Sequence, residues 1–217
     1  MPTARKARMK RKQTQKAWKK RQKLRQLFEL DRKKIKCAQI FCENKKWIAP
    51  SADNRNLATV ESIHRIKFFT LIRALRKRFK NRRIEVLDEG AENSSFARKL
   101  QKKVEKEFGP NSIRVIRTDI RKRGVPTSNL VNTPSERLVE TFGKNRFHLV
   151  VSSFTGLNYT KVNSVKALAN AIEVLRSGGE ARICSNVIKD SDIKTIEKNF
   201  RNVYIVRNEF RIVIFKR

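Results

Sequence analysis

Acidic residues are scarce in this chain of 217 residues. Twenty Asp and Glu residues face 53 Lys and Arg residues, so the formal net charge is +33 and the isoelectric point is near 11.0. Self-repulsion on this scale opposes compaction unless a polyanion neutralises it. Nucleic acid is the expected polyanion, because each phosphate contact releases counterions whatever the base sequence. Such a composition is not that of an ordinary soluble enzyme.

Long apolar runs and paired cysteines are also missing. No run approaches the roughly 20 apolar residues of a membrane-spanning helix, so a membrane is not an expected partner. Cys37, Cys42 and Cys184 fit neither a disulfide framework nor the paired CxxC sets of zinc sites, and His64 and His148 show no metal-ligand spacing. We expect reduced thiols in a cytosol-like compartment and no metal.

The N-terminus lacks the apolar core of a secretory signal, so we expect a protein that is not secreted. Residues 1–25 are rich in Arg and free of acid, as in mitochondrial transit peptides. Their density of Lys and their shortage of Ser and apolar residues favour a tail that binds RNA. The expected location is the cytoplasm or an organellar matrix, in association with ribosomes.

Residues 1–36 concentrate the charge, with 16 Lys and Arg residues against two acids. Apolar residues at helical spacing between 24 and 35 predict a basic helix with one narrow seam when bound, and disorder when free. We expect residues 1–56 to be an RNA-binding extension with a linker, in which Trp18 stacks on an unpaired base or packs on the domain. The expected RNA contacts in this extension are Arg5, Lys6, Arg8, Lys10, Arg11, Lys12, Lys16, Trp18, Lys19, Lys20, Arg21, Lys23 and Arg25.

The segment that follows, residues 57–83, predicts an amphipathic helix whose apolar side packs on a sheet. Its other side carries Arg65, Arg73, Arg76 and Lys77, which we expect to grip RNA phosphates. A solvated charged face is the alternative.

Residues 84–217 alternate strand and helix, which predicts an α/β fold with a mostly parallel sheet and helices on both faces. An antiparallel hairpin around Asn208 is expected at the C-terminal end. "TPSE", at 133–136, predicts a capping box that opens a helix. The expected strands are 84–88, 113–118, 129–131, 147–154, 180–188 and the two hairpin runs, and the expected helices are 94–108, 133–142, 165–177 and 191–199.

Four motifs occur in a familiar order. "VLDEGAENS" is a strand that ends in Asp88 and turns at Gly90; "FHLVVSSFTGLNY" is a later strand with its loop; "ALANAIEVLRSGGEARI" is a helix, a glycine pair and a strand; and the hairpin comes last. Over residues 57–217 the chain resembles the class I methyltransferases, whose Rossmann-like fold binds S-adenosylmethionine. The resemblance implies that Asp88 and Gly90 hold this cofactor and that Asp119 contacts its ribose.

Two positions depart from the family's pattern. Glu92 and Ser94 stand where glycines usually allow the cofactor to approach the backbone. The Glu92 carboxylate would obstruct or repel the methionine carboxylate, whereas Ser94 is a milder change. This departure predicts a weakened or lost cofactor site.

The expected acceptor site is equally unusual. Family members that methylate base amino groups carry an (Asp/Asn)-Pro-Pro-aromatic loop after the fourth strand, and this chain has Ser152-Ser153-Phe154-Thr155 there. The catalytic residues therefore stay unknown, and the candidates at this loop are Ser152, Ser153 and Thr155. Cys184 stands where some cytosine methyltransferases carry a nucleophile, but a single cysteine on an apolar strand usually belongs to the core.

Two functions stay open. The first is an RNA-binding protein, attached to ribosomal RNA beside ribosomal proteins, on a methyltransferase-like domain with a weakened or lost cofactor site. The alternative is an active S-adenosylmethionine-dependent RNA methyltransferase. A third reading, a protein that compacts DNA or packages a viral genome, is less favoured.

Overall fold

The structure is a computed structural model that describes residues 55–91, 94–119, 129–154 and 163–217. All of them belong to one compact unit, Ala49–Arg217. The helix and the RNA contacts expected before residue 55 lie outside the described residues and stay predictions, as does the boundary after residue 56.

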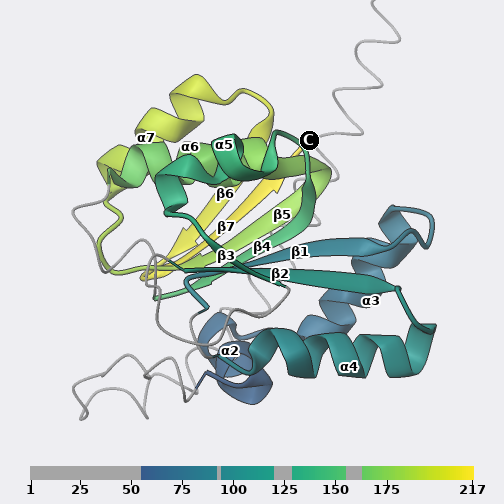
Figure 1. The fold of residues 1–217 in the computed structure, drawn as a ribbon. Helices are drawn as coiled ribbons and strands as arrows, with labels where there is room; N and C mark the ends of the chain where they lie inside the picture. Colours follow the sequence, from purple (N-terminus) through teal and green to yellow (C-terminus); the bar gives the residue numbers. More distant parts are fainter. Residues whose placement is uncertain (1–54, 92–93, 120–128, 155–162) are drawn as a thin grey trace, which may run out of the picture. The chain divides into compact units, whose positions relative to one another are not determined.

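One seven-stranded sheet forms the centre of this unit (Figure 1), with the strand order β3-β2-β1-β4-β5-β7-β6. Neighbouring strands are parallel except around β7, which is antiparallel to both β5 and β6. This confirms the expected Rossmann-like sheet and its terminal hairpin. The strands are β1 Ile84–Glu89, β2 Ile113–Asp119, β3 Leu130–Asn132, β4 Phe147–Ser153, β5 Leu175–Cys184, β6 Val203–Asn208 and β7 Arg211–Lys216.

Helices cover both faces of the sheet (Figure 1). One layer consists of α2 Leu57–His64, α3 Phe68–Arg78 and α4 Phe96–Phe108. The opposite layer consists of the 3-10 helix η2 Ser135–Arg137 with α5 Leu138–Phe142, α6 Ser164–Val174 and α7 Asp190–Asn199.

The central strands β1 and β4 are buried along their whole length because helices lie on both sides of them. Their side chains alternate between two cores. Val86 and Leu149 pack with the α2–α3–α4 layer, and Leu87 and Val150 pack with the α6 side. The polar residues at the ends of these strands follow the same alternation, which decides what each of them can contact.

The predicted helix over residues 57–83 is in fact two helices. Arg65 adopts a left-handed conformation (φ 50°) that ends α2. The buried Glu61 then reaches across the break, since its carboxylate accepts a hydrogen bond of 2.9 Å from the backbone N–H of Phe68 at the start of α3. Amphipathic spacing alone gives no sign of this break, because apolar residues continue on both sides of it.

The capping box expected in "TPSE" does not form. Pro134 is extended and precedes the 3-10 helix, so the element starts with a tighter turn than the α-helix we expected. The Thr133 hydroxyl instead lies 2.8 Å from the Thr141 hydroxyl. The predicted end of the element near Phe142 is confirmed.

The glycine pair of the fifth strand also differs from expectation. The preceding helix ends at Val174, and Gly178 and Gly179 lie inside β5, next to a register irregularity against β4. A Cβ on Gly179 would lie 3.0 Å from the carbonyl oxygens of Arg176 and His148. Glycine is therefore required here by close backbone approach.

Candidate functional site

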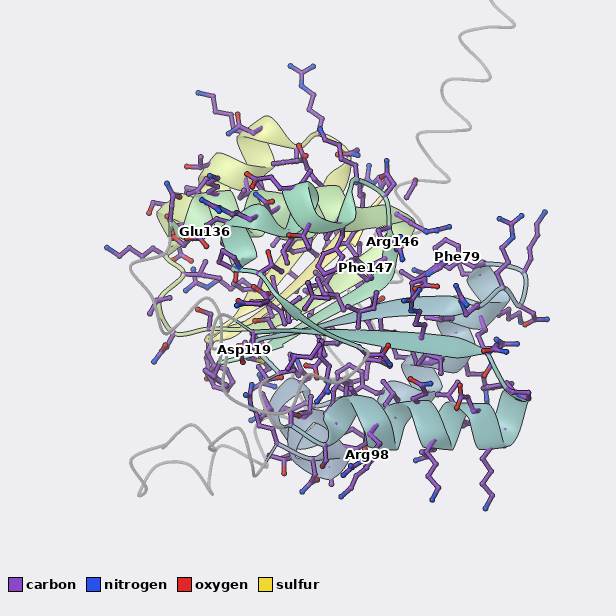
Figure 2. All side chains as sticks on the ribbon, in the orientation of Figure 1. Phe79, Arg98, Asp119, Glu136, Arg146 and Phe147 are labelled. Atoms are coloured by element: carbon purple, nitrogen blue, oxygen red, sulfur yellow. The ribbon has the colours of Figure 1, made fainter. Side chains whose placement is uncertain are left out.

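The sheet order reverses between β1 and β4, and open α/β sheets bind ligands outside the carboxyl ends of the strands at such a point. Buried polar side chains lie at these ends. Asp119 ends β2, at the position labelled in Figure 2. The last two residues of β1, β2 and β4 are all of this kind: Asp88 and Glu89, Thr118 and Asp119, and Ser152 and Ser153. The structure thus brings the predicted cofactor residues and two of the three catalytic candidates to one end of the sheet; Thr155 lies outside the described residues.

The turn after β1 keeps one of the family's glycine requirements. Gly90 has φ 64°, in the left-handed region that favours glycine. Ser94 has a role that glycine could not perform, because its hydroxyl donates a 2.6 Å hydrogen bond to the carbonyl oxygen of Arg55 and accepts one of 3.2 Å from the N–H of Phe96. Glu92, between them, lies outside the described residues.

Arg55 is the functional-site residue that sequence reasoning missed. Its side chain is buried (4% exposed) and lies across the crevice. The guanidinium donates a 2.8 Å hydrogen bond to the carbonyl oxygen of Gly90, after β1, and a longer one of 3.4 Å to that of Ser153, at the end of β4. A buried cation therefore joins the two strand ends between which a ligand of this fold would sit. Its place in a polar, loop-like stretch gives no signal of this role.

The Asp88 carboxyl lies beside this cation. Burial raises its pKa from 3.8 to about 7, although the positive charges of Arg55 and Arg117 act in the opposite direction. Its Oδ2 atom has no hydrogen-bond partner among the described residues. Asp88 is thus close to half protonated at neutral pH.

Glu89 points to the opposite face of the sheet. The Ser135 hydroxyl of η2 donates a hydrogen bond to its carboxylate. Burial raises the pKa of Glu89, and hydrogen bonds from Ser135 and Ser152 oppose that change. Glu89 and Ser152 therefore serve the contact between the sheet and η2, on the side away from Arg55.

Ser153 faces α2 and takes part in a buried chain of hydrogen bonds. His64 Nε2 lies 2.9 Å from Ser153 Oγ, and His64 Nδ1 lies 3.4 Å from Cys184 Sγ. Burial lowers the pKa of His64 to about 3 and raises the pKa of the Cys184 thiol to about 12. The thiol is therefore protonated and the imidazole neutral, so Cys184 lacks the thiolate that a nucleophile needs.

The four cations predicted to bind RNA on α2 and α3 differ in their surroundings. Arg73 forms a 3.1 Å ion pair with Glu107, and Arg76 donates a 3.1 Å hydrogen bond to the carbonyl oxygen of Ser112. Arg65 is half-buried at the end of α2, and Lys77 is exposed.

Two aromatic rings lie beneath these arginines. Phe69 of α3 and Phe108 of α4 stack with their centroids 5.8 Å apart. Arg73 lies 5.0 Å above the Phe69 ring and Arg76 lies 4.8 Å above the Phe108 ring. Both guanidinium groups therefore lie over aromatic rings where α3 meets α4.

The described residues were also searched for a metal site and for a membrane-spanning helix. Within it, no group of three or more His, Cys, Asp or Glu residues is placed to hold a metal ion. The helices of the described ranges include none that is long and apolar enough to cross a bilayer.

No protein-family model matches the chain, and no curated protein matches it. Solved structures that are similar to the chain were found. A SAM-dependent methyltransferase from Archaeoglobus fulgidus is 16% identical, with 67% of this chain and 74% of that chain covered and a TM-score of 0.41. The 1,6-didemethyltoxoflavin-N1-methyltransferase of Burkholderia thailandensis, whose structure holds S-adenosylhomocysteine, is 15% identical, with 75% and 80% covered and a TM-score of 0.40.

With TM-scores of 0.41 and 0.40, these similarities do not assign the fold, which rests on the strand order of the sheet. Parallel strands in the order β3-β2-β1-β4-β5, a reversed β7 inserted beside β5, and helices on both faces are all present. The chain has the fold of the class I methyltransferases.

Proposed function

We propose that this protein binds RNA, in association with ribosomal RNA and neighbouring ribosomal proteins, on a methyltransferase fold whose cofactor site is weakened or lost. The net charge of +33 is the observation that carries the proposal. A surface with so few acids needs a polyanion to relieve its self-repulsion, and RNA phosphates supply one.

Arg55 supports the loss of the cofactor site. S-adenosylmethionine carries positive sulfonium and ammonium groups beside its carboxylate, and the crevice already holds a buried guanidinium at the carbonyl oxygens of Gly90 and Ser153. The carbonyl oxygens that could accept hydrogen bonds from the ammonium group therefore already accept them from Arg55, whose charge would also repel that group. The residues present do not fit this cofactor unless Arg55 moves.

The surroundings of the two described catalytic candidates also speak against methyl transfer. Ser152 is fully buried on the η2 side and Ser153 is 4% exposed, bonded to His64. Neither hydroxyl is placed to meet a nucleotide. Burial of this kind is typical of structural serines.

An active RNA methyltransferase is the second candidate. It is favoured by the positive φ of Gly90 and by Asp88 and Asp119, which lie at the two strand ends where the family holds its cofactor. In that reading, Arg55 would leave the crevice when the cofactor enters.

Isothermal calorimetry with S-adenosylmethionine separates the two. We expect no heat of binding at millimolar cofactor with the natural chain. Micromolar binding that Gly90→Trp abolishes would establish the enzyme and overturn the lost site.

Sedimentation independently tests the part of the proposal that concerns RNA binding. We expect the protein to sediment with ribosomal particles at moderate salt and to dissociate as salt rises, since phosphate contacts are screened. A protein that stays at the top of the gradient at physiological ionic strength, and that ignores purified ribosomal RNA, would refute the proposal.

A further inference from the structure

A groove of about 670 Å³ runs between α4 and strand β2. Val115 and Arg117 of β2 and Ala97 of α4 line it. It begins at Ser94, beside the crevice that holds Arg55, and continues along α4 as far as Lys106. Within the described residues, no further helix covers this part of β2.

Cations line the α4 side of the groove. Arg98, Lys102 and Lys106 all lie along it and are exposed; the long side chain of Arg98 projects from α4 in Figure 2. They are spaced four residues apart, so successive charges follow one another about 6 Å along the helix axis. Such a row matches the spacing of phosphates along an extended nucleic-acid strand.

Within the described parts of the chain, no salt bridge to an acid neutralises this row. Among the described residues, Arg98, Lys102 and Lys106 form no ion pair. Glu105 is the single acid among the described lining residues, and its carboxylate accepts a 3.1 Å hydrogen bond from Gln101.

The row has a cost for the free protein. Like charges at positions i and i+4 destabilise a helix, and this row contains two such pairs. Neutralisation by an anionic ligand would remove that cost. The segment 120–128, which follows β2 in the chain, cannot supply the neutralising negative charge, because it contains Arg121, Lys122 and Arg123 and no acid.

We propose that this groove binds the sugar-phosphate backbone of an RNA strand, with Arg98, Lys102 and Lys106 contacting successive phosphates. Guanidinium groups suit this task because they donate paired hydrogen bonds to phosphate oxygens. The described lining residues include no aromatic side chain, so the groove reads charge and not base identity. The proposal rests on the RNA-binding function proposed above and assigns part of it to this groove.

The test measures binding of fluorescein-labelled oligouridine RNA to the full-length chain across a series of salt concentrations. Lys102→Ala/Lys106→Ala should weaken binding several-fold. It should also lower the slope of log K against log salt by about 1.4, because each of the two phosphates that the lysines neutralise accounts for about 0.7. The variant should unfold at a temperature no lower than the natural chain, because alanine favours helix and the repulsion is gone.

A matched control comes from the opposite layer. Lys194→Ala/Lys198→Ala removes two exposed lysines, also four residues apart, from α7. This variant should bind RNA with nearly the affinity and salt slope of the natural chain. Equal effects of the two double variants would overturn the groove and leave the RNA-binding function standing, whereas a natural chain that does not bind RNA would overturn both.

A gain of affinity offers a check that misfolding cannot imitate. Glu105→Gln removes the acid from the groove and keeps the side-chain size, so RNA binding should tighten a few-fold. No change in affinity would count against the groove. Competition by polyglutamate as strong as by RNA would show a site for acidic protein segments, contrary to the proposal.

Discussion

Asp88 and His64 titrate in opposite senses at the same end of the sheet. The folded protein raises the pKa of Asp88 from 3.8 to about 7, so between these values the folded state binds the proton that the unfolded state has lost, and the contribution of Asp88 to stability falls as pH rises. The pKa of His64 falls from 6.5 to about 3, so between these values the unfolded state holds the extra proton. Its contribution therefore rises with pH.

Asp88→Asn should separate these two effects. Asparagine resembles the protonated carboxyl and does not ionise. The variant therefore lacks the loss of stability with rising pH that ionisation of Asp88 causes. Its free energy of unfolding relative to the natural chain should increase between pH 4 and pH 7, by an amount of the order of 4 kcal/mol, and stay constant above pH 7. Urea unfolding at pH 4, 5.5, 7 and 8.5 measures the difference.

His64→Asn serves as the control of opposite sign. Its stability relative to the natural chain should fall as pH rises from 3 to 6.5, since the natural chain gains from keeping a neutral imidazole there. A difference between Asp88→Asn and the natural chain that does not change with pH would show that Asp88 is ionised throughout in the folded protein.

At the scale of the elements, the joint between α2 and α3 depends on one buried carboxylate. Glu61 accepts a hydrogen bond from the Phe68 N–H and pairs with Lys67 at 3.2 Å. Glu61→Ala should cost about 1 kcal/mol or more in the free energy of unfolding, as the loss of a helix cap does. Glu61→Gln should cost less, because its amide oxygen can still accept that bond.

Lys67→Ala is the control for the ion pair. Lys67 is 77% exposed, so the pair is screened by solvent and its loss should stay within about 0.5 kcal/mol. If Lys67→Ala and Glu61→Ala cost the same, the ion pair and not the cap would hold the joint. Chemical denaturation at one pH and salt concentration compares all three variants.

The elements also show where local patterns stop being informative. The spacing of apolar residues predicts the helices and strands because each buries one face, and the sheet confirms most of them. The break at Arg65 is not predicted, because it depends on a hydrogen bond that Glu61 accepts from the backbone N–H of Phe68, seven residues later, and no apolar spacing encodes this bond. Gly179 is expected in a turn, but it lies inside β5. A side chain is excluded there because carbonyl oxygens lie too close to the position of a Cβ atom.

For the whole molecule, charge decides the strongest prediction. Residues 1–36 hold 16 of the 53 Lys and Arg residues, so their deletion should sharply weaken RNA binding and flatten its dependence on salt. Filter binding to ribosomal RNA over a range of salt concentrations measures both. The deleted chain should still unfold cooperatively, since its compact unit begins at Ala49.

An unchanged affinity and salt slope after that deletion would show that the extension does not contact RNA. Loss of cooperative unfolding would instead mean that these residues support the domain. The groove beside α4 is tested separately by its own variants, so a failure of the extension does not decide the groove.

The sequence by itself determined the composition of charge, the alternation of strand and helix, and the positions of Asp88, Gly90 and Asp119 at strand ends. These are local properties: a buried strand must be apolar, and a left-handed turn favours glycine. They were enough to predict the fold, and enough to cast doubt on the cofactor site through residues near the turn.

Only the tertiary structure placed Arg55 in the crevice. It bonds to carbonyl oxygens 35 and 98 residues away along the chain, and backbone oxygens are present at every residue, so no sequence pattern marks this pairing. The same holds for the chain from Ser153 through His64 to Cys184, whose members lie about 90 to 120 residues apart. The topology of the sheet determines which distant side chains meet. That topology exists only in the folded chain.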